Sequence, residues 1–110
     1  MKLKPPMSKA KDKLGLIDKR FKVPVDVIRS LEALTPLFGS KGRAIQIGTE
    51  LLIGMRRKPK VKENPEPVHA QIYSITPRTL DLIEQLLPSY DKRGTVLRAV
   101  VQVLQERLAA

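Results

Sequence analysis

The chain contains one sequence pattern twice. Residues 23–52 and 75–104 match at a constant offset of 52 positions, through two helical segments and the turn between them. The offset aligns Val23 with Ile75, Leu31 with Ile83, Glu32 with Glu84, Pro36 with Pro88, Phe38 with Tyr90, Gly42 with Gly94 and Leu52 with Leu104. A unit of about 45 residues is too small to bury a stable core alone. The repeat therefore predicts a pseudo-dimer in which the two copies bury a shared face.

Each copy begins with a short run of strand-like alternation. In residues 20–23, cationic and apolar side chains alternate, which is typical of a strand with one buried face. A helical spacing of apolar residues follows Pro24 in the first copy and starts at Pro77 in the second. We expect these helices to end near Thr35 and at Pro88, because proline disfavours helical geometry in the residue before it.

A second helix is predicted in each copy. Gly39 is a typical helix stop and Ser40 a typical N-cap, while Asp91 is expected to cap the last helix. The expected buried stripes consist of Ala44, Ile45, Ile47, Leu51 and Leu52 in one helix, and of Val96, Leu97, Val100, Val101, Leu104 and Leu108 in the other. Each unit is thus predicted to be strand, helix, turn and helix.

Most of the net charge of +10 lies outside the two copies. Residues 1–20 carry a net +5 and residues 56–69 a net +3, and both segments contain proline and no apolar periodicity. We divide the chain into a basic arm (1–18), a first unit (19–55), a proline- and lysine-rich linker (56–69) and a second unit (70–110). A basic arm that leads into a duplicated small domain favours nucleic acid as the partner, because cations neutralise phosphates.

Other functional classes find little support in the sequence. There is no cysteine, which favours the cytosol and excludes disulfides and thiolate metal sites. No apolar run resembles a signal peptide or a membrane span. The single histidine, His69, is expected in the linker, and the carboxylates, hydroxyls and glycines form no catalytic cluster or phosphate loop. We expect no enzymatic activity, metal, cofactor or small-molecule substrate.

The strand, the helix after a proline and the Gly- and cation-rich start of the second helix together resemble the ribbon-helix-helix DNA-binding proteins, the Arc, MetJ and CopG class of repressors. The resemblance covers about residues 19–55 and 70–108. It implies a mainly helical fold with a short two-stranded antiparallel ribbon, in which two intertwined units insert the ribbon into the DNA major groove. Two units on one polypeptide are similar to tandem proteins of conjugative plasmids.

The resemblance implies that outward strand residues contact bases. These are Arg20 and Lys22 in the first unit, where arginine suits guanine. In the second unit the same register gives Ile72 and Ser74, which implies different half-sites. A slip of one residue would instead present Gln71 and Tyr73.

The resemblance further implies phosphate contacts at the starts of the second helices, where backbone amides bind anions. The residues concerned are Ser40, Lys41, Gly42 and Arg43 in the first unit, and Lys92, Arg93, Gly94 and Thr95 in the second. Glycine at these positions is expected to permit close approach to the phosphate.

The leading functional hypothesis is a cytoplasmic, nucleoid- or plasmid-associated protein that binds double-stranded DNA sequence-specifically. Its role would be that of a transcriptional repressor or of a plasmid copy-number, partition or conjugation factor, with further self-association on adjacent sites. Two alternatives remain. One is an antitoxin of the same fold, which typically needs a tail to wrap its toxin. The other is a helical protein-interaction module that does not touch DNA.

Overall fold

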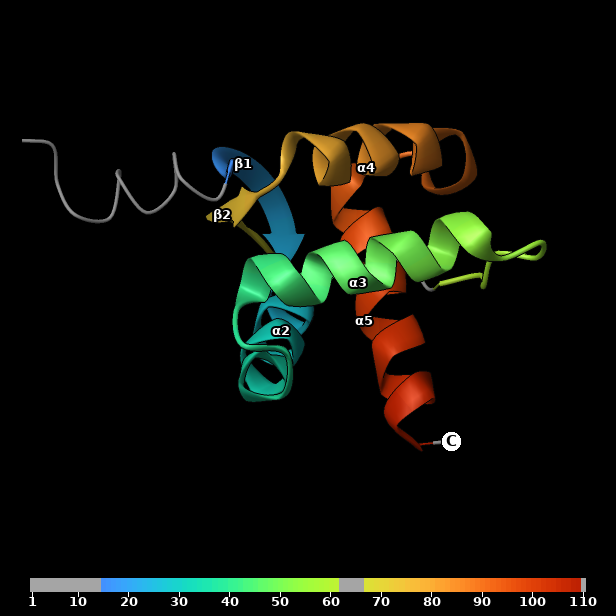
Figure 1. Ribbon diagram of the computed structural model, residues 1–110, viewed down its shortest axis with the longest axis horizontal. Helices are drawn as coiled ribbons and strands as arrows, with labels where there is room; N and C mark the ends of the chain where they lie inside the picture. Colours follow the sequence, from blue (N-terminus) through green and yellow to red (C-terminus); the bar gives the residue numbers. More distant parts are fainter. Residues whose placement is uncertain (1–14, 62–66, 110) are drawn as a thin grey trace, which may run out of the picture.

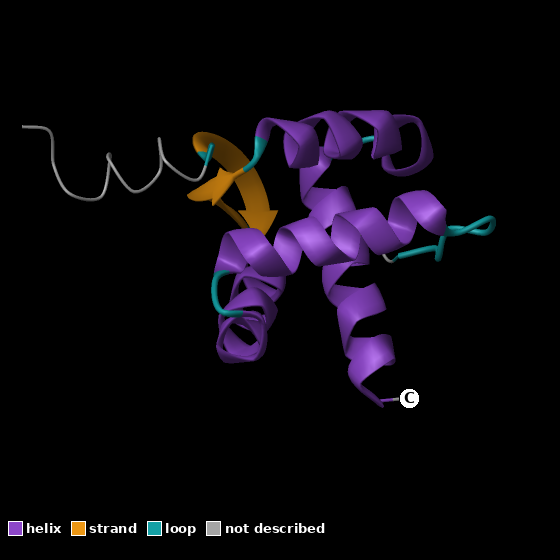
Figure 2. Cartoon of the chain, viewed as in Figure 1, coloured by secondary structure: helices purple, strands orange, loops and turns teal. Residues whose placement is uncertain are grey.

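The computed structural model describes residues 15–61 and 67–109. The described chain is mainly helical and has the element order β1, α2, α3, β2, α4, α5 (Figure 1). The two strands form one small sheet at one side of the helices (Figure 2). The predicted arm lies almost wholly outside the described residues, as do positions 62–66 of the predicted linker.

The ribbon is longer than the sequence predicts. Strand β1 spans Ile17–Pro24 and begins inside the predicted arm, while β2 spans Val68–Ile75 and begins inside the predicted linker. The strands are antiparallel, and Arg20 lies opposite Ile72. These two residues are separated by the offset of the repeat, 52 positions, so the centre of the ribbon relates the two copies.

The inner and outer faces of the ribbon follow the strand period of two. Phe21, Val23, Tyr73 and Ile75 are buried in the core. The outer face carries Arg20 and Ile72, as the first register predicts. The slipped register, with Gln71 and Tyr73 facing outward, is wrong for Tyr73, because its ring packs against Phe21 with centroids 6.0 Å apart.

The first helix of each copy runs through its proline. Helix α2 spans Val25–Phe38 and α4 spans Pro77–Tyr90, so the predicted ends at Thr35 and Pro88 are wrong. Each helix stops only two residues after the proline, so the ring removes a single hydrogen bond of the last turn. Burial of Tyr90 and partial burial of Phe38 against the core stabilise that turn. The start of α4 agrees with prediction, with Pro77 in its first turn.

The turns between the helices are equivalent but use different residues. Gly39 ends α2 with φ +90°, and Asp91 ends α4 with φ +68°. Ser40 caps helix α3, Lys41–Gly54, and accepts a hydrogen bond from Arg43 N at 3.0 Å, as predicted. Helix α5 spans Arg93–Ala109, so Asp91 lies too early to be its N-cap, which corrects that expectation.

The second helices carry the centre of the core. Helices α3 and α5 cross each other, α3 packs against β2, and α5 packs against β1 (Figure 1). Each second helix therefore contacts the strand of the other copy. The largest side chains of the core that are almost fully buried are Phe21, Leu31, Ile45, Leu52, Ile75, Ile83, Leu86, Leu97 and Leu104. Leu108 is 51 % exposed rather than buried, because the last turns of α5 extend beyond the crossing.

Helices α3 and α5 meet at Gly48 and Val100, which are equivalent in the repeat. A Cβ atom added at Gly48 would lie 2.5 Å from Val100 Cγ1. The crossing therefore has no room for a large side chain on both helices, and the glycine of α3 accommodates the valine of α5.

We expect Gly48→Ala to lower the free energy of unfolding by about 1–3 kcal/mol through overpacking. Urea denaturation measures the change. Adding Val100→Ala removes the clashing methyl groups, so the double variant should be more stable than the sum of the two single changes predicts. Additive losses would show that the two residues do not limit the approach of the helices.

Candidate nucleic-acid interface

The outer face of the ribbon carries different chemistry on its two strands. β1 presents Asp18, Arg20 and Lys22, all of them exposed. β2 presents Ala70 and Ile72, both exposed, and the partly exposed Ser74. The four predicted base-contact residues thus share one face. Sequence reasoning missed Asp18 and Ala70, although extending the same alternation by one step at each strand finds them.

Two of these outer residues bond to each other. Ser74 lies directly opposite Asp18, and its hydroxyl donates a hydrogen bond to Asp18 Oδ1 at 2.6 Å. The hydroxyl of Ser74, one of the predicted base-contact residues, is therefore engaged with a carboxylate on the same face.

Gly42 and Gly94, at the starts of α3 and α5, allow these helices to lie close to the ribbon. A Cβ atom added at Gly42 would lie 2.0 Å from the carbonyl oxygen of Ser74. At Gly94 it would lie 2.6 Å from the carbonyl oxygen of Lys22. Ser74 and Lys22 are separated by the same offset of 52 positions, so the two contacts correspond to each other, and the contact at Gly42 is the closer one. Each glycine therefore permits its helix to approach the ribbon closely. The N-terminus of α3 lies beside one end of the ribbon, and that of α5 lies beside the other end.

A concave surface joins the ribbon to the start of α5. It has a volume of about 730 Å³, and its charged lining residues include Arg20 and Lys22 from β1. Lys92, Arg93, Gly94 and Thr95, the predicted phosphate contacts of the second unit, line it as well. The fold therefore brings predicted strand and helix residues, which are about 70 positions apart in sequence, into one basic surface.

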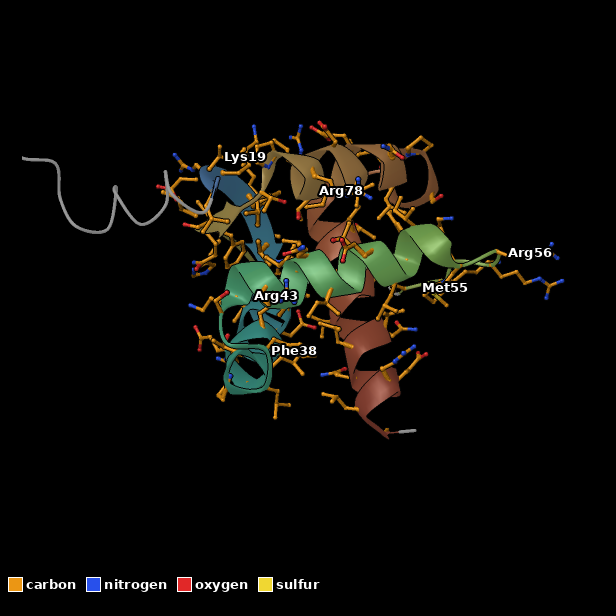
Figure 3. All side chains as sticks on the ribbon, viewed as in Figure 1. Lys19, Phe38, Arg43, Met55, Arg56 and Arg78 are labelled. Atoms are coloured by element: carbon orange, nitrogen blue, oxygen red, sulfur yellow. The ribbon has the colours of Figure 1, made fainter. Side chains whose placement is uncertain are left out.

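At the other end of the ribbon the predicted residues belong to the start of α3. Arg43 is exposed there, whereas Lys41 and Gly42 are partly buried (Figure 3). Arg56, from the predicted linker, lies at the opposite end of α3 (Figure 3). The cations at the start of α3 thus share a side of the molecule with the ribbon, and Arg56 does not.

Two arginines of the concave surface are bound to carboxylates. Arg93 Nε donates to Glu84 Oε2 at 3.3 Å, and Arg93 Nη2 donates to Glu84 Oε1. Arg98 donates to both carboxylate oxygens of Asp26, at 2.7 and 2.9 Å. The hydrogen bonds from Arg98 lower the pKa of Asp26 below its usual value, so this carboxylate stays ionised at more acidic pH than an ordinary aspartate does. Both pairs hold their guanidinium groups in place and reduce the net positive charge of the surface.

Tyr73 lies beneath the outer face with its hydroxyl buried and without a hydrogen-bond partner in the described chain. Burial, together with the nearby charge of Glu32, raises the pKa of Tyr73 to about 12. The folded state therefore retains the phenolic proton at a pH where the unfolded chain has lost it. Since the folded pKa is the higher one, stability falls as pH rises from about 10 to about 12.

We expect Tyr73→Phe to keep or raise the free energy of unfolding near neutral pH, by up to about 1 kcal/mol, because it removes an unpaired buried hydroxyl. The variant should also lose less stability than the unchanged protein at about pH 11. Tyr90→Phe is the matched control. The Tyr90 hydroxyl donates to the carbonyl oxygen of Pro59 at 2.8 Å, so its removal should cost about 1 kcal/mol. Burial raises the pKa of Tyr90 as well, so both variants should lose less stability than the unchanged protein at about pH 11. Urea denaturation near neutral pH distinguishes the two tyrosines.

His69 lies in β2 opposite Val23, exposed, and not in the linker as predicted. Within residues 15–61 and 67–109, no three His, Asp or Glu side chains gather as metal ligands. None of the described helices is long and apolar enough to cross a membrane. Comparison with protein-family models, with curated proteins and with solved structures finds no match.

Proposed function

We propose that the protein binds double-stranded DNA sequence-specifically by inserting its ribbon into the major groove. The observation that carries this proposal is the outer face with Arg20 and Lys22, which has a helix N-terminus beside each end. The major groove admits a two-stranded ribbon, and its base edges distinguish all four base pairs. Arg20 would read guanine there.

In this proposal the chain is a single-chain pair of intertwined ribbon-helix-helix units. Three features support it: the repeat at offset 52, the pairing of β1 with β2, and the packing of each second helix on the other copy's strand. One polypeptide then supplies both units, which in a dimer come from two chains. Folding therefore does not depend on protein concentration. The regulated process would be transcription or the maintenance or transfer of a plasmid, in the cytoplasm.

The helix starts would position the ribbon on the duplex. Backbone amides at the starts of α3 and α5, with Arg43 and Lys92 beside them, would bind phosphates on the two sides of the groove. Such contacts act on any sequence, so they set register and orientation. Discrimination between sequences falls to the outer residues of β1 and β2.

Selection from a random duplex library at about 0.15 M salt tests the proposal. We expect a recovered motif. Arg20→Ala should lower affinity for that motif by about 5-fold or more, and affinity for random duplex by less. Arg43→Ala and Lys92→Ala should weaken both kinds of binding equally. Arg56→Ala, the same change of charge away from the ribbon, is the control.

The outcomes separate the hypotheses. If the protein retains duplexes that share no motif, it binds DNA through phosphate contacts alone. No retention would refute DNA binding and favour a protein-interaction module, and co-purification with a small toxin would favour an antitoxin.

Glu84→Gln provides a separate prediction. It weakens the pairing that holds Arg93 and removes the carboxylate that balances the charge of this lining residue of the concave surface. We expect affinity for random duplex to rise on the order of 2- to 10-fold, with a steeper dependence on salt. Glu50→Gln makes the same change of charge at an exposed carboxylate of α3. An equal gain in both variants would show that net charge alone matters and that releasing Arg93 does not.

A further inference from the structure

The outer face of the ribbon lacks the two-fold symmetry of its backbone. The register pairs Asp18 with Ser74, Arg20 with Ile72, and Lys22 with Ala70. A half-turn about the ribbon centre exchanges residues that are equivalent in the repeat. It would bring Ala70 to the position of Asp18, Ser74 to that of Lys22, and Ile72 to that of Arg20. At each of these positions the two copies present different chemistry.

The two ends of the ribbon differ in charge as well. One end carries the Asp18 carboxylate and the Ser74 hydroxyl, beside the start of α3. The other end carries the Lys22 ammonium and the Ala70 methyl group, beside the start of α5. A ribbon whose two ends differ in this way presents different chemical groups to the two halves of a binding site.

Asp18 is the exposed acidic residue of the outer face. In the proposed complex its carboxylate is repelled by the phosphates, so it lowers affinity for random duplex. An ionised carboxylate is an acceptor only, and in the major groove cytosine N4 is the donor that aspartate pairs with. The hydrogen bond from Ser74 at 2.6 Å orients the carboxylate before any base arrives.

We propose that Asp18 is a specificity-determining residue that reads cytosine, with Ser74 as its positioning residue, and that it imposes one orientation on a non-palindromic site. This inference rests on the proposed DNA binding. If the protein bound such a site in the reverse orientation, the Ala70 methyl group would lie against the cytosine. The Asp18 carboxylate would then lie against a base in the other half of the site, where the unreversed protein places Ala70.

Base-by-base substitution of the selected site tests the role of Asp18 in the full chain. Asp18→Asn should reduce the preference for cytosine at one position by at least about 5-fold, while affinity for random duplex rises. Ser74→Ala should reduce the preference for cytosine at the same position, while affinity for random duplex stays unchanged. Ser74→Thr keeps the hydroxyl and should retain the preference for cytosine. Unchanged base preferences in Asp18→Asn would overturn the inference and leave the proposed function intact. An unchanged protein that selects no motif would overturn both.

Tethered cleavage tests the single orientation. The chain has no cysteine, so Leu37→Cys and Ser89→Cys each supply one thiol for an iron chelate. Both positions are exposed, they are equivalent in the repeat, and neither belongs to the interface. Each labelled protein should cut one flank of the site, and the two proteins should cut opposite flanks. Equal cutting on both flanks by each protein would overturn the single orientation.

Discussion

Leu31→Asp is expected to unfold the entire chain, including the second copy. Leu31 is fully buried, and so is Ile83, its equivalent in the repeat. A carboxylate at either position is buried without a partner, which costs more than about 4 kcal/mol in a domain whose total stability is typically about 5–15 kcal/mol. Because α3 and α5 cross and each contacts the other copy's strand, the two copies have no separate cores.

Circular dichroism measures this outcome. Leu31→Asp and Ile83→Asp should each abolish the helical signal of all four helices. The milder Leu31→Ala and Ile83→Ala should each lower the free energy of unfolding by about 2–5 kcal/mol, in one transition with an unchanged urea dependence. Ala33→Asp places the same charge on the exposed side of α2 and should change little. Loss of half the helical signal in either aspartate variant would contradict a shared core.

Gly42→Ala and Gly94→Ala are expected to have the second-largest effect. The added methyl group would lie 2.0 Å from a ribbon carbonyl oxygen at Gly42 and 2.6 Å at Gly94. The obstructing atoms belong to the backbone and cannot rotate away, so the helix start must move from the ribbon. We expect a loss of about 3 kcal/mol or more for Gly42→Ala and a smaller loss for Gly94→Ala, at the upper end of overpacking costs.

Gly54→Ala is the matched control in the same helix as Gly42. No atom lies within 4 Å of a Cβ atom added there, so the replacement should stabilise the helix by up to about 1 kcal/mol. Urea denaturation of the three variants measures the contrast. Should Gly42→Ala prove as stable as Gly54→Ala, the close contact between helix and ribbon would be refuted. A folded Gly94→Ala protein with weakened DNA affinity would link this contact to function.

The elements could be predicted because their signals are local. The alternation around Phe21, the cap at Ser40 and the start of α4 at Pro77 follow from the residues themselves and their neighbours. The errors at Pro36 and Pro88 have a non-local cause. A proline near a helix end costs little when the following residues pack against a core, and the sequence does not show that core.

The candidate interface was predictable in part for the same reason. The resemblance pointed to Arg20 and Lys22 on one strand and to the cationic starts of two helices. It did not show that Glu84 binds Arg93 or that Ser74 bonds to Asp18, since the latter two residues are 56 positions apart. The phosphate contacts of Gly42 and Gly94 stay a prediction, and the structure adds that a Cβ atom built at either glycine would lie nearest to a ribbon carbonyl oxygen.

The sequence by itself determined that two equivalent strand-helix-helix units are joined in one chain, because apolar periodicity and capping are properties of consecutive residues. The tertiary structure alone decided the ribbon register and the crossing at Gly48. It also decided which outer residues face each other. In the second strand, a shift of one residue would violate no local preference and would present Gln71 and Tyr73 in place of Ile72 and Ser74. Only the burial of Phe21 and Tyr73 against helices from both copies selects the register that turns Arg20 and Asp18 outward.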